Sequence, residues 1–225
     1  MNRYLNNHPA NIEFLNQMQT NVGFRVNLFA MNIEDIDAVP GSAATRARNA
    51  VSETVSRLER LAKDTSKTDD AKHEAAKVLF QNAEKEVSRS IGIIRQYGER
   101  EAEAAKNRAF EVLRPDPLQK EIYSEIRAYC ASRRTDPDFP AELSKMVAEN
   151  LDVARAINAG PGFLSGIGDD RRTRLVTGAL ETFAPDDIAH MNHALAVGKE
   201  ADRMETGLRK LGQAMFTSSL ADRAT

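Results

Sequence analysis

The longest periodic pattern of apolar residues predicts one long helix from residue 69 to about residue 114. Small and apolar side chains recur there every 11 residues, a period typical of a nearly straight helical stripe. Pro115 and Pro117 follow, and proline stops a helix because it lacks the N–H and clashes with the preceding turn. At 1.5 Å per residue the helix is about 70 Å long, and Gly92 and Gly98 are its two candidate bend points. The stripe consists of Phe80, Ala83, Val87, Ile91, Ile94, Gly98, Ala102, Ala105, Ala109 and Leu113.

Shorter stretches on both sides of this helix also place apolar residues at helical spacing. In one of them Leu118, Ile122, Ile126 and Tyr129 share a face, which we expect to point inward. Pro185 and Asp186 open the last helix, which ends near residue 216. The predicted shorter helices cover 42–63, 116–134, 140–158, 169–183 and 185–216.

The last of these helices carries a heptad seam, in which apolar residues alternate in steps of four and three. Such a seam is typical of a helix that packs lengthwise against another helix, in the same chain or in a partner. The seam consists of Val197, Ala201, Met204, Leu208, Leu211 and Met215.

Residues 1–41 differ from the rest because they are rich in asparagine and poor in charge. Their apolar residues fit a helix, but those between residues 22 and 30 also alternate as in a strand, so both remain open. The segment is either a first helix docked on the core or an arm that becomes ordered on a partner. On the second interpretation, a chain without residues 1–35 stays folded but no longer assembles. The partner-binding side chains of the arm are then Val22, Phe24, Val26, Leu28 and Phe29.

Residues 160–168 form a glycine-rich loop that also carries apolar side chains. A phosphate-binding loop follows a strand and is followed by a Lys-Ser or Lys-Thr pair. This loop has neither feature, so it is not interpreted as a phosphate-binding loop. Exposed apolar side chains on a mobile loop favour docking to a protein. Phe163, Leu164 and Ile167 are therefore predicted to bind a partner.

These elements together predict an all-α fold, an elongated helical bundle built around the long helix. The predicted parts are an arm or docking segment at 1–41, a bundle at 42–159, the loop at 160–168 and a helical hairpin at 169–225.

Composition removes several classes of function. The 31 basic and 33 acidic residues give a net charge of −2, so no global charge attracts nucleic acid or an anionic membrane. The single cysteine excludes an internal disulfide framework. No apolar run is long enough to span a membrane, and the first residues lack the apolar core of a signal peptide. We therefore expect a protein that is cytoplasmic as synthesised.

Few residues suggest reaction chemistry. Asp186, His190 and His193 have the i, i+4, i+7 spacing of metal ligands on a helix. They lack the glutamate that lies between the two histidines in the metal-binding helix of zinc proteases. We therefore prefer a capping role for Asp186 and surface roles for the two histidines. Cys130 has no neighbouring base and is interpreted as structural. The arginines at 171, 172 and 174 follow the glycine-rich loop, but the adjacent acidic pair makes a solvated helix start the preferred interpretation.

The sequence therefore favours a non-enzymatic structural protein that builds a homo-oligomer or a larger assembly through protein contacts. Small all-helical chains that form rings, such as head-to-tail adaptors and connectors of phage virions, are an analogy in architecture only. The alternative is a cytoplasmic regulatory module that binds a partner helix. A metal-dependent enzyme is the weakest of the three hypotheses, and no cofactor or metal is expected.

Overall fold

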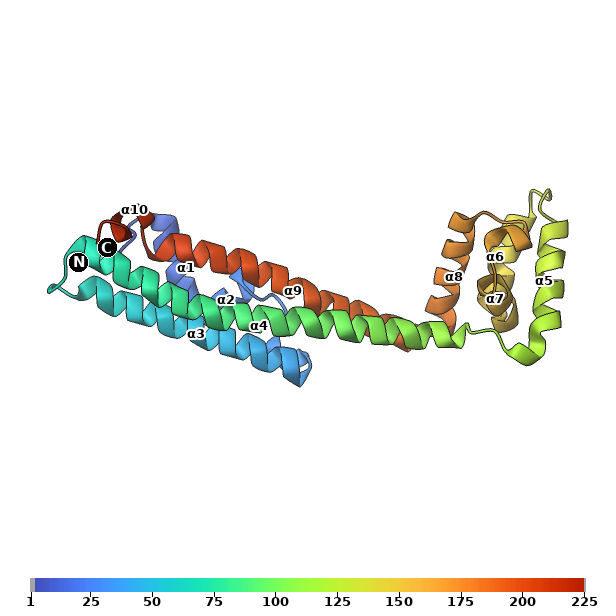
Figure 1. Ribbon diagram of the computed structural model, residues 1–225, viewed down its shortest axis with the longest axis horizontal. Helices are drawn as coiled ribbons and strands as arrows, with labels where there is room; N and C mark the ends of the chain where they lie inside the picture. The colour runs from blue at the N-terminus through green and yellow to red at the C-terminus, as the bar shows by residue number, and fades with distance from the viewer. Residues whose placement is uncertain (1–2, 225) are drawn as a thin grey trace. The chain divides into compact units, whose positions relative to one another are not determined.

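The computed structural model describes residues 3–224, except for the side chain of Glu34, and every regular element in this range is helical (Figure 1). This confirms the predicted all-α class. The elements are α1 (Pro9–Met18), α2 (Asn21–Asn27), η1 (Ile33–Asp35), α3 (Ala38–Lys63), α4 (Asp69–Val112), η2 (Pro117–Gln119), α5 (Lys120–Ser132), α6 (Phe139–Glu149), α7 (Leu151–Asn158), η3 (Gly162–Ser165), α8 (Asp169–Phe183), α9 (Pro185–Met215) and α10 (Ser218–Ala221).

The chain divides into two compact units, each with its own apolar core. Unit 1 comprises Met1–Arg100 and Ala194–Thr225, and unit 2 comprises Glu101–His193. This division differs from the four consecutive parts expected from the sequence, because α4 and α9 each supply residues to both cores. Composition marks the asparagine-rich and glycine-rich segments, but it does not show which distant segments share a core.

The long helix α4 is confirmed, with 44 residues between Asp69 and Val112. Thr68 Oγ1 accepts a hydrogen bond from the backbone N–H of Ala71 at 3.4 Å, and two aspartates lie in the first turn, where they complement the helix dipole. The stripe with the 11-residue period faces the two cores, and all its members are buried except the half-buried Phe80. The stripe is therefore covered by the chain itself and is not left for a partner.

Helix α9 lies beside α4 in unit 1 and runs in the opposite direction (Figure 1). Its heptad seam, from Val197 to Met215, is buried in the core of unit 1. At Gly98 the two backbones almost touch, since a Cβ added there would lie 2.6 Å from the Cα of Gly198. Gly98 thus allows α4 and α9 to cross closely. Gly92 has no such role, because an added Cβ there would meet nothing within 4 Å.

Helix α3 begins four residues earlier than the sequence predicts. Its first residue is Ala38, and Pro40 and Gly41, expected to end the preceding segment, lie in its first turn. The first N–H groups of a helix have no intrahelical acceptor, so a proline there costs no hydrogen bond. The first such bond runs from the Gly41 N–H to the Asp37 carbonyl at 2.9 Å.

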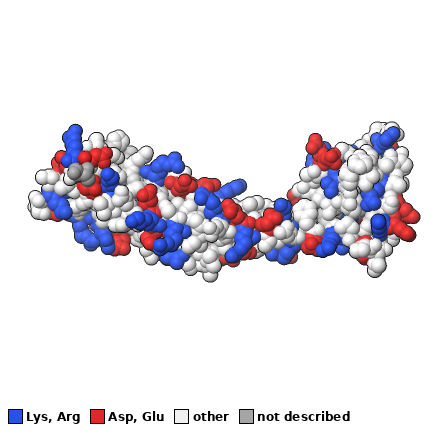
Figure 2. All heavy atoms as spheres, in the orientation of Figure 1, with Lys and Arg blue, Asp and Glu red and all other residues white. Residues whose placement is uncertain are grey.

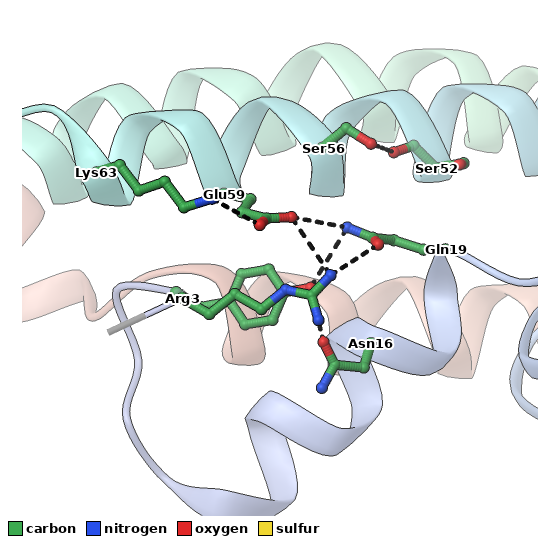
Figure 3. Close-up of polar contacts among 8 residues, drawn as sticks. Arg3, Asn16, Gln19, Ser52, Ser56, Glu59 and Lys63 are labelled. Carbon is green, nitrogen blue, oxygen red and sulfur yellow. Dashed lines mark hydrogen bonds and ion pairs between the residues drawn. The ribbon is translucent and has the colours of Figure 1, made fainter. Parts of the chain in front are cut away.

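The N-terminal segment is docked on α3 by a polar network (Figure 3). Arg3 Nη2 donates to Gln19 Oε1 at 3.1 Å and lies 3.4 Å from Glu59 Oε2. Glu59 also accepts a hydrogen bond from Lys63 Nζ at 2.9 Å, and this bond is the main cause that lowers the pKa of Glu59. The side chain of Tyr4 is buried and its hydroxyl lies 3.1 Å from Asn16 Oδ1. Of the two interpretations of this segment, the structure shows the docked one for residues 3–41, and residues 1 and 2 lie outside the described part.

The end of α9 is held to α4 by a buried histidine. His73 is 5% exposed, and its Nδ1 accepts a hydrogen bond from the backbone N–H of Thr217 at 2.8 Å. Lys77 Nζ lies 3.0 Å from Asp222 Oδ1 beyond α10 and adds a second link. Protonation of Nδ1 would place a donor against the Thr217 donor.

We expect this histidine to make unit 1 less stable at mildly acidic pH. Burial lowers the pKa of His73 from its ordinary value, and the nearby Asp69 and Asp70 oppose this shift only in part. The unfolded chain then binds the proton more readily. The contribution of His73 to the free energy of unfolding is therefore complete above about pH 6.5 and is lost as the pH falls below that value.

The measurement is the melting temperature between about pH 7 and about pH 5, in the range where histidine titrates. The matched variant is His73→Asn, whose amide oxygen can accept the same bond but does not titrate. The melting temperature of the wild type should fall more steeply than that of the variant. Equal slopes would show that His73 is not the group responsible.

Unit 2 is a small bundle of α5, α6, α7 and α8 together with the parts of α4 and α9 within Glu101–His193. Its core contains Leu113, Phe139, Leu143 and Ile157. Around the turn between α5 and α6, the Arg133 guanidinium lies 5.0 Å from the ring centre of Phe139 and also pairs with Asp136 and Glu142.

Candidate interaction surfaces

Helix α2 is short and is held firmly in place. Thr20 Oγ1 accepts a hydrogen bond from the Gly23 N–H at 2.9 Å, which caps the first turn. The backbone of Gly23 approaches the end of α1 so closely that an added Cβ would lie 2.0 Å from the Gln17 carbonyl oxygen. Arg203 of α9 donates to the Val26 carbonyl, and Glu200 accepts from the Ala30 N–H at 2.7 Å. These bonds fix one face of α2 outward.

The predicted partner-binding residues of the first segment divide into two groups. Val22 and Val26 are 72% and 59% exposed and remain candidates for contact. Phe24, Leu28 and Phe29 have no exposed area and belong to the core of unit 1, so the prediction that they bind a partner is wrong. The strand considered for this stretch is also wrong, because α2 is helical and its inward face is set by helical spacing.

Two arginines line a surface pocket beside α2. The pocket has a volume of about 360 Å³, and Arg25 and Arg48 share it with the side chains of Asn21, Asn32 and Thr45. Neither arginine side chain forms an ion pair or a hydrogen bond with the other side chains that the structure describes. The exposed valines of α2 are thus bordered by two cations that have no ion-pair partner among the side chains that the structure describes.

The glycine-rich loop is an ordered turn that contacts α5. Gly166 has φ = 66°, a conformation that favours glycine, and a Cβ there would lie 3.0 Å from the Cα of Ala131. The Ile167 N–H donates to the Gly162 carbonyl at 3.0 Å, and the Gly162 N–H donates to Asp169 Oδ1 at 3.2 Å. The glycines therefore permit tight local packing, and one backbone N–H already bonds to a carboxylate of the chain.

The apolar side chains of this loop point in different directions. Phe163 is 75% exposed and Leu164 is 46% exposed, so both remain candidates for contact with a partner. Ile167 is half-buried and packs against the core of unit 2, which weakens its assignment to the surface.

The most exposed large apolar side chain in the described part is one for which the sequence predicts the opposite. Leu118, in η2, is 94% exposed, and Ile122, one turn later, is 50% exposed. The inward face of α5 is instead formed by Tyr123 and Cys130, seven residues apart. Of the four residues predicted to point inward, only Ile126 does so, since it is half-buried and packs against the core of unit 2. Tyr and Cys rank below Leu and Ile in hydrophobicity, so the pattern of the most apolar residues does not show that Tyr123 and Cys130 form this face. Tyr129, also expected inward, is 43% exposed.

The residues with possible metal chemistry do not converge. Asp186 is exposed in the first turn of α9, and His190 Nε2 lies 3.7 Å from Glu101 Oε2. His193 is exposed on the same helix. Among the side chains that the structure describes, no group of three or more His, Cys, Asp or Glu has the arrangement of a metal site.

The remaining chemical candidates have structural roles. Cys130 is buried, and burial raises the pKa of its thiol, the opposite of what activates a nucleophile. Arg172 donates to the carbonyls of Ile157 and Asn158 at the end of α7, and Arg171 donates to the Pro140 carbonyl. Arg174 lines a shallow depression with Arg171.

The charges on the surface are mixed. On the face shown in Figure 2, basic and acidic side chains alternate over both units and neither sign dominates a large area. Among the described residues, no helix combines the length and apolarity needed to cross a bilayer. Because positive and negative charges are mixed in this way, the candidate surfaces differ from one another only in the few charged side chains that each contains.

Comparison with protein-family models, with curated proteins and with solved structures finds no match for this chain.

Proposed function

We propose that this chain is a structural protein that assembles through non-covalent contacts between copies and has no enzymatic role. The observation that carries the proposal is the distribution of apolar side chains. The long helices α3, α4 and α9 cover their apolar stripes within the chain and expose Val39, Val78, Phe110 and Leu195 only to between 39% and 53%, while the three most exposed large apolar side chains lie in the short elements α2, η2 and η3. These residues are Val22, Leu118 and Phe163.

The exposed residues belong to two separate units, which supports a bridging role. Unit 1 contributes Val22 and unit 2 contributes Leu118 and Phe163. Exposed apolar side chains that cluster on ordered elements mark contact sites more often than scattered single ones do. A chain with such sites on two units can contact two neighbours at once.

The narrower proposal is a component of a phage virion, such as a head-to-tail adaptor or connector, made in the cytoplasm and then incorporated. The support is architectural analogy: an all-helical chain with contact surfaces on two units suits a ring of many copies.

We expect the sedimentation coefficient of the purified chain to rise with protein concentration, because weak contacts between copies fill by mass action. Electron micrographs of the concentrated sample should show closed rings or filaments. A concentration-independent coefficient together with small separate particles would contradict an assembly role.

One observation favours the alternative, a regulatory module that binds a partner helix. A groove of about 610 Å³ lies between α4 and α9, with Phe80, Ile91, Leu208 and Phe216 among its lining residues. Gly92 also lines it and leaves room for a close approach. A monomer that binds an amphipathic helical peptide in this groove would support the alternative.

A further inference from the structure

Helix α2 presents an apolar and basic face to solvent. Val22, Arg25 and Val26 are spaced i, i+3 and i+4, so they lie on one side of the helix. All three are exposed, and the two valines are 72% and 59% exposed. Arg48, from α3, lies in the adjoining pocket beside Arg25.

The segment from η2 into the first turns of α5 presents the same residue spacing with the opposite charge. Leu118, Glu121 and Ile122 are spaced i, i+3 and i+4, and Glu125 continues the face one turn later. All four are exposed. Neither glutamate side chain forms an ion pair or a hydrogen bond in the part of the chain that the structure describes.

We propose that the Val22–Arg25–Val26 face of one copy docks on the Leu118–Glu121–Ile122 face of a second copy. The two valines then cover Leu118 and Ile122, and Arg25 and Arg48 meet the two glutamates. The inference rests on the proposed assembly function and names the contact that carries it. The partner is this chain itself because it contains both complementary faces.

Charge selects this pairing over a symmetric one. If α2 met α2 of another copy, Arg25 would face Arg25, and if α5 met α5, Glu121 would face Glu121. Like charges across an interface oppose association, whereas opposite charges steer it. The contact is therefore heterologous, between two different surfaces, and such contacts build rings or open filaments.

The α2 face is already ordered before it meets a partner. The Arg203 bond to the Val26 carbonyl and the Gly23 approach to Gln17 hold the helix in place. A surface that is ordered in advance loses little conformational entropy on association.

The test uses two full-length variants, Val22→Asp and Leu118→Asp, each of which damages one of the two faces. Both positions are exposed, so both variants should keep the circular dichroism of the wild type. Loss of a central apolar contact weakens association by about tenfold or more. We therefore expect each variant alone to be monomeric at a concentration at which the wild type assembles.

The decisive sample is a 1:1 mixture of the two variants. Leu118→Asp keeps an intact α2 face and Val22→Asp keeps an intact α5 face, so the mixture can form one sound contact and should give a heterodimer. The other pairing stays weak because it places two aspartates together. Val78→Asp is the matched control, since Val78 is 46% exposed on α4 outside both faces, and it should assemble as the wild type does.

The outcomes separate this contact from the assembly function. A mixture that stays monomeric, or a single variant that assembles like the wild type, overturns the α2–α5 contact while assembly itself stands. A wild type that is monomeric at every concentration overturns both.

Discussion

A chain that lacks residues 1–35 should lose the cooperative unfolding transition of unit 1. The deletion removes large side chains that have at most 1% exposure and belong to one core. Truncating one such side chain costs about 2–5 kcal/mol, and the whole stability of a domain is about 5–15 kcal/mol. The loss therefore exceeds what unit 1 can tolerate. The side chains removed are Tyr4, Leu15, Met18, Phe24, Leu28 and Phe29.

Thermal unfolding followed by circular dichroism measures this effect, and two point variants calibrate it. Phe24→Ala should lower the free energy of unfolding by about 3–5 kcal/mol because the ring is fully buried. Val22→Ala, two residues away and 72% exposed, should change it by less than about 0.5 kcal/mol. A truncated chain with a sharp, wild-type-like transition would mean that residues 1–35 are a dispensable arm.

Gly98→Ala should destabilise unit 1 by about 3 kcal/mol, the upper end of the usual cost of overpacking. The new Cβ would lie 2.6 Å from the Cα of Gly198 and 2.8 Å from the carbonyl oxygen of Ala194. Both are backbone atoms, which cannot rotate aside as a side chain can. The helices α4 and α9 would have to separate at this crossing.

The matched control, Gly92→Ala, should raise the free energy of unfolding of unit 1 instead of lowering it. Gly92 lies in the same helix, but an added Cβ would meet nothing within 4 Å. Alanine is favoured over glycine inside a helix by about 0.5–1 kcal/mol. Urea unfolding of both variants gives the two values. Equal effects would show that the close crossing at Gly98 does not limit stability.

The long helix could be predicted from the sequence because its cause is local. Its period of 11, the aspartates in its first turn and the prolines after it all lie within 50 residues of sequence. The bend considered at Gly98 could not be settled, because the reason for that glycine is Gly198, 100 positions later.

The candidate surface was predicted only in part, for a related reason. Alternation in the first segment marks Val22 and Phe24 equally, yet one faces solvent and the other lies in the core. In the segment formed by η2 and α5, hydrophobicity predicts that Leu118 is buried, but Leu118 is exposed and Tyr123 is buried instead. Contacts between distant parts of the chain decide which apolar residues stay exposed. The pattern of apolar residues along the sequence gives no information about those contacts.

The charge complementarity between the two faces has a sequence signal that could have been found. The spacing Val22–Arg25–Val26 matches Leu118–Glu121–Ile122, with opposite charges at the middle position. The match gains meaning only when both sets are exposed, which the structure shows.

Native mass spectrometry of the full-length chain over a range of concentrations tests the central claim most directly. One chain has a mass of 24.9 kDa. An assembly protein should give species at integer multiples of that mass, whose share grows with concentration. A single species at the mass of one chain, at every concentration, would contradict the account.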